Sequence, residues 1–485
     1  MEGVVTWANR VLLAVLLAVV AWHFALRVQL IADHRVDLGG AEINVVYGAQ
    51  KILLGRPLYE DPEQPPFDVM QYTPAYYALL AGMAKAMGVG PADTYGLYLI
   101  NRIMALVMNL LTCALVYALC RAVGVTRWIA IAVALFAFVL FTEHFFGRGD
   151  ALYALLFAAA LLVHARGLEQ HRHRALLFTA LLSVLCVLAK QTGLLVIGII
   201  AFDLLLRRAW REAWIFAVAV AALGSIAALA IATSASGPYF LKNTVQGLAN
   251  GISPSLYHEF RDLATYKYYA PFHAALLVLV ARAIAFGGRT DRFLASAGGL
   301  SLAFGLLAGL KSGSNLNYLF EAHLLASVLV ARSWRGTSRW PHIAMLLFMI
   351  LFARHRSVLL QRRTDVAEVE RHAAAYRADL AVHRALLNEL GLKPAEKVLV
   401  TYRGHLELLL NGQGLVAQKD VVSWSVRDVY DLSAFIRMMD EGEVRYVIGE
   451  SPRDTLRFRG HEWFPVRSVL EVEGRYVLQL PAVAP

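Results

Sequence analysis

Long apolar runs alternate with short polar segments along the first three quarters of the chain. Several runs approach the roughly 20 residues that a helix needs to cross a hydrocarbon core of about 30 Å. Such runs predict membrane-spanning helices in an all-α bundle. About eleven spans are predicted, over residues 11–30, 95–119, 128–146, 151–165, 175–189, 193–206, 213–232, 272–286, 294–310, 318–331 and 340–353.

The segment 31–94, between the first two spans, is too polar to cross a bilayer. Apolar residues recur at helical spacing after Glu42 and stop at Gly55, which predicts a helix lying along the membrane surface. A second surface helix is predicted over 74–87. Between the two helices, carboxylates alternate with prolines, and this pattern predicts a solvated turn. These carboxylates are Glu60, Asp61, Glu63 and Asp68.

The last part of the chain, 356–485, is hydrophilic and follows a membrane domain that covers 1–355. Residues 364–392 have helical spacing, and 397–401, 446–449 and 476–480 read as short strands. A small soluble α/β domain is therefore predicted at the C-terminus. No motif with chemistry in it is found there.

Composition agrees with a polytopic membrane protein, since 58% of the 485 residues are hydrophobic and the mean hydropathy is +0.53. The formal net charge is +10, but the basic residues cluster in short loops between apolar runs, which argues against a nucleic-acid partner. No cleavage site of small residues follows the first run, so it is not read as a signal peptide. The three cysteines lie inside apolar runs and fit no metal or disulfide pattern.

Arg-rich loops follow the second, fourth, sixth, eighth and tenth spans. Basic loops stay in the cytoplasm, so all five alternate loops are assigned to that side and the N-terminus with them. The segment 31–94 and the C-terminal domain are then predicted on the outer side.

Polar and charged residues gather at the predicted outer ends of the spans. Ionisable groups at membrane depth are costly and need a partner or a function. The cations among them suit a phosphate or pyrophosphate, to which Arg offers a fork and Lys a point charge. The alternative is that they pair with Asp150, Glu143 and Glu321 or reach lipid headgroups. The set comprises Arg148, Asp150, Lys190, Lys311, Asn315, Asn317 and Glu321.

Several short motifs occur in a fixed order along these segments. Within 31–94 they are Tyr47-Gly48-Ala49, Gly55-x-Pro57-Leu58-Tyr59 and Tyr72-Thr73-Pro74-x-Tyr76-Tyr77; later come Arg148-Gly149-Asp150, Lys190-Gln191-Thr192 and Asn315-x-Asn317-Tyr318-x-x-Glu321. Over about residues 1–335, this order resembles the GT-C fold membrane glycosyltransferases. That superfamily includes the protein mannosyltransferases, the lipid A aminoarabinose transferase and many bacterial relatives.

The resemblance implies a glycosyltransferase of the bacterial cytoplasmic membrane that takes a sugar from a polyprenyl-phosphate donor. The acceptor would be a hydroxyl of a lipid, a glycan or a protein, and the configuration would invert. Glu42 matches the catalytic base, with Asp37 as the second candidate. Many relatives have adjacent Asp-Glu where Ala41-Glu42 stands here, so a second carboxylate would come from Asp37 or Asp150. No cofactor is required by these motifs, and a divalent metal is left open.

The resemblance also implies that Arg148, Lys190 and Lys311 bind the donor phosphate. Further substrate-binding candidates are Asp150, Gln191, Asn315, Asn317, Tyr318, Glu321 and Tyr72. Aromatic residues of the loop 234–271 either stack on sugar or lipid or form an interfacial belt; they are Tyr257, Tyr266, Tyr268 and Tyr269.

Two other functions remain open. A transporter or flippase for a lipid-linked sugar would hold phosphate with the same cations, but it predicts charges at mid-depth and broken helices in repeated positions. A non-catalytic assembly protein would leave the charged cluster without a role.

Overall fold

A computed structural model of the chain describes residues 2–170, 173–249, 251–252, 263–311, 314–333, 340–393, 396–412, 429–452, 456–458 and 460–480. The chain divides into two compact units. The first contains Met1–Ile31, Ile103–Ala228 and Gly251–Thr364. The second contains Ala32–Arg102, Leu229–Asn250 and Asp365–Pro485.

The first unit is a helical bundle, and each predicted span coincides with one helix. The start of the second of these helices, up to Arg102, and the end of the seventh, from Leu229, belong to the second unit. The helices are α1 (Glu2–Ile31), α4 (Thr94–Ala122), α5 (Arg127–Leu140), α6 (Gly149–Gln170), α7 (His173–Ala189), α8 (Leu194–Leu206), α9 (Trp210–Ala232), α12 (Leu263–Phe286), α13 (Arg289–Ala308), α14 (Phe320–Ser333) and α15 (Trp340–Gln361). Short 3₁₀ turns join some of them: η1 (Glu143–Phe145), η2 (Gln191–Gly193) and η5 (Leu316–Leu319).

Six of the described helices are long and apolar enough to cross a membrane. The six segments are Trp7–Ile31, Thr94–Ala122, Gly149–Gly167, Trp210–Ala232, Tyr268–Phe286 and His342–Gln361. The predicted helices of the bundle are therefore confirmed as helices, whereas a count of eleven spans stays a prediction.

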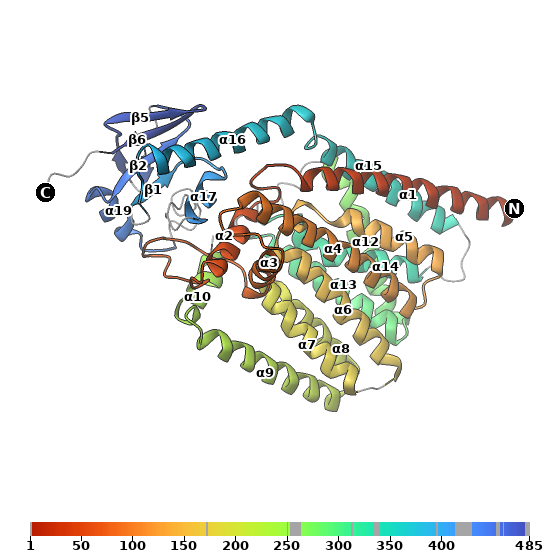
Figure 1. The fold of residues 1–485 in the computed structure, drawn as a ribbon. Coiled ribbons are helices and arrows are strands. Elements are labelled where there is room, and N and C mark those ends of the chain that lie inside the picture. Colours follow the sequence, from red (N-terminus) through yellow and green to blue (C-terminus); the bar gives the residue numbers. More distant parts are fainter. Residues whose placement is uncertain are drawn as a thin grey trace. The chain divides into compact units, whose positions relative to one another are not determined.

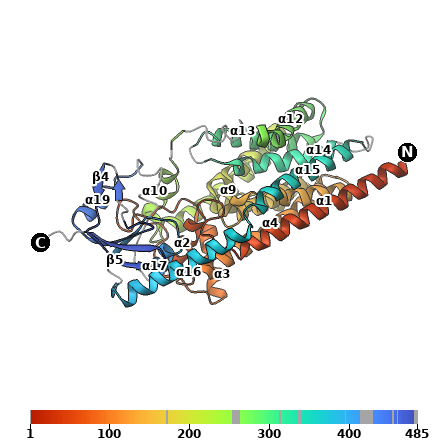
Figure 2. The same cartoon turned by 90° about the horizontal axis from the view of Figure 1, so that it is seen from above.

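Neighbouring helices of the bundle pack side by side, α6 against α7 and α1 against α15 (Figure 1). Figure 2 shows α1 and α15 together again from another side. Aromatic rings fill the centre of this unit: Phe141 stacks on Phe320 with centroids 5.0 Å apart, and Phe136 stacks on Phe272 at 5.7 Å. Burial of such rings supplies much of the packing energy of a helical core.

The second unit begins with the two short helices that were predicted in the first loop, α2 (Glu42–Leu53) and α3 (Pro74–Ala86). The carboxylate of Asp37 accepts the backbone N–H groups of Ala41 and Glu42 at 2.9 and 3.1 Å. These bonds satisfy free donors at the start of α2. The chain leaves α2 through Gly55, whose positive φ lies in the left-handed region that favours glycine. The predicted limits of both helices are thus confirmed.

Close contact between α2 and α3 depends on Gly48. A Cβ atom there would lie 2.4 Å from the ring of Tyr77, so any other residue would push the helices apart. The Tyr77 hydroxyl donates to Asn44 at 2.6 Å, and the Tyr76 hydroxyl donates to Asn101 at 2.9 Å. These motif tyrosines therefore hold helices together.

The described residues of the tail form one long helix, two short helices, a four-stranded mixed sheet and a two-stranded sheet of β3 and β4. Its elements are α16 (Val366–Asn388), β1 (Lys397–Val400), α17 (Leu406–Gly412), α19 (Ser433–Asp440), β2 (Val444–Gly449), β3 (Leu456–Phe458), β4 (His461–Trp463), β5 (Arg467–Val472) and β6 (Arg475–Gln479). The four-stranded sheet has the order β1-β2-β6-β5, with β1 parallel to β2 and the other pairs antiparallel. The α/β character predicted for the tail is confirmed.

The tail shares hydrophobic cores and hydrogen bonds with the first loop. Phe67 of the loop meets Phe435 of α19 edge to face at 5.5 Å. The amide of Gln50 donates to the carbonyl of Leu408 and accepts from Asn411, both at 3.0 Å. A short segment that completes the unit contains η3 (Gly237–Tyr239), α10 (Phe240–Thr244) and η4 (Gln246–Leu248). The tail and the first loop thus form one folded body.

The carboxylates between α2 and α3 are not a solvated turn, and this expectation was wrong. Asp68 is fully buried and pairs with Lys51 at 2.5 Å, while Glu60 contacts the same ammonium at 2.9 Å. Asp61 and Glu63 share the ammonium of Lys242, each at 2.7 Å. Burial of a charge requires such partners, and these are supplied by residues outside the turn.

Acid should destabilise the second unit through His405. Its Nε2 donates to the carbonyl of His34 at 2.8 Å, and Nδ1 lies 3.0 Å from the Thr94 hydroxyl. Burial lowers the pKa of His405 to about 4, aided by the charge of Arg102. The unfolded chain binds a proton near pH 6.5 and the folded chain does not, so up to about 3 kcal/mol of stability is lost between pH 6.5 and 4. The unfolding temperature in detergent, measured from pH 6.5 to pH 4, checks this loss of stability. The variant His405→Gln should flatten the pH dependence, and an unchanged slope would contradict it.

Candidate active site

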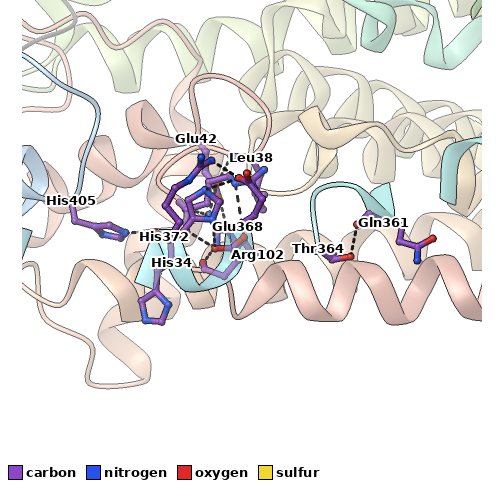
Figure 3. A network of polar contacts seen from close by, with 12 residues as sticks. His34, Leu38, Glu42, Arg102, Gln361, Thr364, Glu368, His372 and His405 are labelled. Carbon is purple, nitrogen blue, oxygen red and sulfur yellow. Dashed lines mark hydrogen bonds and ion pairs between the residues drawn. The ribbon is translucent and has the colours of Figure 1, made fainter. Parts of the chain in front are cut away.

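The N-terminus of α2 brings the two predicted catalytic carboxylates together. Glu42 opens the helix, and Asp37 caps it from the preceding turn. Figure 3 shows the side chain of Glu42 in a network with Arg102 of α4. The two carboxylates nevertheless have very different surroundings.

Glu42 is 1% exposed and has donors at every lone-pair position. Arg102 forks onto it, with Nε 2.9 Å from Oε1 and an Nη 3.0 Å from Oε2. The backbone N–H of Leu38 donates to Oε2 at 3.1 Å, and the amide of Asn101 approaches Oε1 at 3.4 Å. Burial raises the pKa of Glu42, although the guanidinium opposes this. The guanidinium of Arg102 compensates the burial of the Glu42 carboxylate.

Asp37 uses two of its four lone-pair positions within the described part of the chain, both for backbone N–H groups of α2. Its side chain is 10% exposed, and the guanidinium of Arg403 lies 3.9 Å away. Asp37 can therefore accept a proton from an incoming hydroxyl, whereas Glu42 would first have to release a donor.

Arg102 is a residue that sequence reasoning missed. Besides Glu42, its guanidinium donates to the carbonyls of Asp33 and Arg35, both at 2.5 Å. It thus fixes the start of the first loop to α4. An arginine two turns inside an otherwise apolar helix is costly without partners. The position of Arg102 in the sequence could therefore have indicated that it has a buried partner.

The tail reaches the same part of the second unit through α16. His372 of this helix lies 3.0 Å from the carboxylate of Asp33, and Glu368 lies 3.9 Å from His372 and from Arg35 (Figure 3). No residue of the tail was predicted to take part in this network, because the contacts join positions that are far apart along the chain.

A second cluster lies in the first unit, where α6 begins and α7 ends. Asp150 is buried at the first turn of α6 and accepts from Lys190 at 2.6 Å and from the Asn317 amide at 2.8 Å. The guanidinium of Arg148 lies 3.5 Å from its other oxygen. The predicted polar residues at these helix ends are thus brought together.

The local backbone explains how Lys190 reaches this cluster. Lys190 is extended and precedes η2, whose Gly193 packs against the last turn of α7. A Cβ atom on Gly193 would lie 2.3–2.4 Å from the backbone of residues 186 and 187, so the tight turn requires glycine. The turn leaves the Lys190 ammonium over the ring of Tyr318, 4.9 Å from its centroid. A cation is stabilised in that position.

Lys311 completes the set of cations. Burial lowers its pKa to about 8, and the charges of Lys190 and Arg148 contribute to this, which places the three cations within electrostatic range of one another. Glu321 is buried at the start of α14, within range of Lys190 and Asp150. Three cations therefore face two carboxyl groups, and a phosphate suits such a cluster.

Other predicted substrate ligands have structural contacts. The Asn315 side chain accepts from the backbone N–H of Leu316 and caps η5. Gln191 opens η2 and is half-buried. Tyr72 is buried beside Tyr77, and its carbonyl accepts from the Tyr59 hydroxyl at 2.8 Å. These three residues are placed by contacts within the protein.

The predicted aromatic set of the loop 234–271 is only partly described. Tyr257 and the side chain of Tyr266 lie outside the described residues. Tyr268 stacks on His355 with centroids 4.0 Å apart, and Tyr269 is buried against His323. The two described rings therefore pack within the helical bundle.

Among the described residues, no group of three or more His, Cys, Asp or Glu side chains could hold a metal ion. The sequence left a divalent metal open, and that expectation stays a prediction.

These features are those of a polytopic membrane protein. No family model matches the sequence, and no curated protein matches it either. The fold is shared with two solved structures of ArnT from Cupriavidus metallidurans. The one bound to undecaprenyl phosphate has a TM-score of 0.61 and 14% identity, covering 96% of this chain and 98% of that one. The apo state has a TM-score of 0.57 and 14% identity, covering 97% and 98%.

The fold is also similar to that of the archaeal oligosaccharyltransferase AglB from Archaeoglobus fulgidus, in complex with an inhibitory peptide and a dolichol-phosphate. The TM-score is 0.60 at 12% identity, and the match covers 90% of this chain and 69% of that one. At such identities the comparisons establish the fold, and the expected GT-C resemblance is confirmed.

Proposed function

We propose that the protein is a membrane glycosyltransferase that moves a sugar from a polyprenyl-phosphate donor to a hydroxyl group of a lipid, glycan or protein. The observation that carries this proposal is the cluster in which Lys190 and Arg148 contact the buried Asp150, with Lys311 in electrostatic range of both cations, on a GT-C fold. The similar structures were solved with undecaprenyl phosphate and dolichol-phosphate, which are ligands of the proposed donor class. The location is the outer face of a bacterial cytoplasmic membrane, as the alternate Arg-rich loops predict.

The proposed reaction is a single in-line displacement that inverts the anomeric configuration. The acceptor oxygen attacks the anomeric carbon while the bond from that carbon to the phosphate oxygen breaks. The hydroxyl proton passes to a carboxylate, and the polyprenyl phosphate leaves with the electron pair. The cations stabilise the negative charge that grows on this leaving group. Asp150 holds Lys190 and Asn317 in place for that role.

For the proton acceptor we favour Asp37 over Glu42. Asp37 keeps free lone-pair positions and some exposure, and Glu42 is saturated by Arg102, Leu38 and Asn101. Glu42 then acts as a positioning residue that fixes the N-terminus of α2. The motif alone ranked Glu42 first and Asp37 second as the catalytic base, and our proposal exchanges the two.

A transfer assay in detergent micelles separates this function from a flippase. Micelles have no compartments, so a flippase has no measurable action on a lipid-linked sugar, and a transferase still forms product. Lipid and glycan profiles of a deletion strain would first identify the sugar and acceptor by their loss. Purified protein in micelles should then restore the missing product from the lipid fraction of that strain. Product formation in membranes but not in micelles would contradict the proposal.

Binding of the donor phosphate should weaken as pH rises through about 8. Lys311 loses its proton in this range, and one charged donor to the phosphate is lost with it. A hydrogen bond to a charged group is worth enough to lower affinity roughly tenfold or more. Undecaprenyl phosphate binding at pH 7 and pH 9 measures this.

The variant Lys311→Arg keeps its charge at both pH values and should bind equally well at each. Lys85→Arg, at an exposed site on α3, is the matched control and should behave as the wild type. A wild-type affinity that is the same at pH 7 and pH 9 would exclude Lys311 as a phosphate ligand.

A further inference from the structure

A cavity in the first unit lies at the far ends of α6 and α7 from Asp150 and Lys190. It has a volume of about 310 Å³. Its wall includes His164, which lies about four helical turns beyond Asp150 on α6. The cavity is therefore distinct from the proposed phosphate cluster, and the proposed function leaves it without a role.

Five helices contribute to the cavity where they end or begin. Its floor is apolar and comes from Ala175, Leu176, Leu204 and Ala209. The polar lining residues are His164, His173, Thr179, Arg207, Glu212 and Arg289. Basic side chains outnumber the one carboxylate among them, so the cavity suits an anion with an apolar part.

Two of the basic lining residues contact the buried carboxylate of Asp203. Asp203 accepts from His164 at 2.7 Å through one oxygen and from Arg207 at 3.0 Å through the other. Arg207 is placed by a tight turn in which Arg208 adopts a positive φ. Asp203 thus compensates Arg207, and each of its two oxygens already has a donor.

Arg289 is the other arginine in the cavity wall, and Asp203 does not compensate its charge. It is exposed at the first turn of α13, and no ion pair from it is found among the described residues. Burial lowers the pKa of Arg207, and the charge of Arg289 lowers it further, so the two guanidinium groups lie within electrostatic range. Two neighbouring guanidinium groups favour a bound phosphate.

The surroundings indicate that the anion comes from the membrane. The helix α9, which supplies Glu212 to the wall, exposes Trp210 and Trp214 at 61% and 72%. In α9, Phe216 is the single buried side chain among those described. Exposed tryptophans at the end of a lipid-facing helix mark the headgroup level of a bilayer.

We propose that this cavity binds an anionic glycerophospholipid, with the phosphate of its headgroup on Arg289 and Arg207 and the first carbons of its acyl chains on the apolar floor. Basic pockets between membrane helices favour such headgroups. The bound lipid would join the ends of α6, α7, α8, α9 and α13. Lipid binding at this cavity does not depend on the proposed transferase activity.

Native mass spectrometry of the full chain, released from detergent with added phosphatidylglycerol or phosphatidylcholine, tests the proposal. The wild type should retain phosphatidylglycerol at roughly tenfold lower concentration than Arg289→Gln, because one charged contact is lost. Arg292→Gln removes the same charge one turn along the same exposed helix end, outside the cavity, and should equal the wild type. Phosphatidylcholine should bind all three equally weakly.

Two results would overturn the proposal. Equal retention of phosphatidylglycerol by Arg289→Gln and Arg292→Gln would show that the cavity does not select the anion. Displacement of the lipid by inorganic phosphate at the same concentration would show that the site takes a soluble phosphate. Unfolding temperatures without added lipid, expected to be equal for both variants, would establish that each is folded.

Discussion

Replacing Asp37 by Asn should lower sugar transfer by about 10²- to 10⁴-fold, the range typical for loss of a general base. Asn is a good helix-start residue, but it has one acceptor oxygen where Asp has two. It should therefore keep one of the two backbone hydrogen bonds that Ala41 and Glu42 donate to Asp37, and the chain should still fold. Binding of undecaprenyl phosphate should stay unchanged, because the exchange leaves the cation cluster intact. Initial rates in micelles and a lipid-binding curve measure both effects.

Asp93 offers a matched control for this substitution. Its carboxylate accepts the backbone N–H of Gly96 at 2.8 Å near the start of α4, so Asp93→Asn repeats the same chemical change at another helix start. That variant should keep full activity. Glu42→Gln should reduce the rate less than Asp37→Asn does. If Glu42→Gln abolishes transfer and Asp37→Asn does not, Glu42 is the base and our order is wrong.

Replacing Arg102 by Gln should lower the free energy of unfolding by about 3–5 kcal/mol, the cost of breaking a buried ion pair by removing one partner. The substitution leaves the carboxylate of Glu42 buried without its guanidinium. The carbonyls of Asp33 and Arg35 lose their donors as well. Chemical unfolding of the purified protein in detergent measures the change.

Two further variants determine whether the ion pair is the cause. Arg102→Lys should not restore stability, because an ammonium group cannot reach the four acceptor atoms that the planar guanidinium of Arg102 contacts. The double variant Glu42→Gln with Arg102→Gln should lose less than the sum of the single losses, since neither buried charge remains. Strict additivity of the two single effects would contradict the coupling between these residues.

The helices of this protein could be predicted from its sequence because each depends on local pattern. Apolar runs of sufficient length mark the bundle helices, and Gly55 and Pro74 mark where α2 ends and α3 begins. The strands β1, β2 and β6 were found for the same reason, as short runs of β-branched and aromatic residues. Local signals of this kind need no knowledge of distant partners.

The pairing of charges could not be predicted in this way. Asp68 was expected in solvent because its neighbours are prolines and carboxylates, yet its burial depends on Lys51, which lies 17 positions earlier. The saturation of Glu42 depends on Arg102, 60 positions later. The cluster around Asp150 was found because basic residues are uncommon at the outer ends of spans, and such an exception is visible in a sequence. Its hydrogen-bond geometry required the structure.

The contacts between the first loop and the tail bear on the order in which the protein is made. Asp33 and His34 leave the ribosome long before His372 and His405, which hold them in the folded unit. The bundle helices can enter the membrane one after another during synthesis, but the loop that carries Asp37 and Glu42 lacks these contacts until the tail has followed. Activity should therefore appear as a late event in biogenesis, and a chain that stops before the tail should insert without becoming an enzyme.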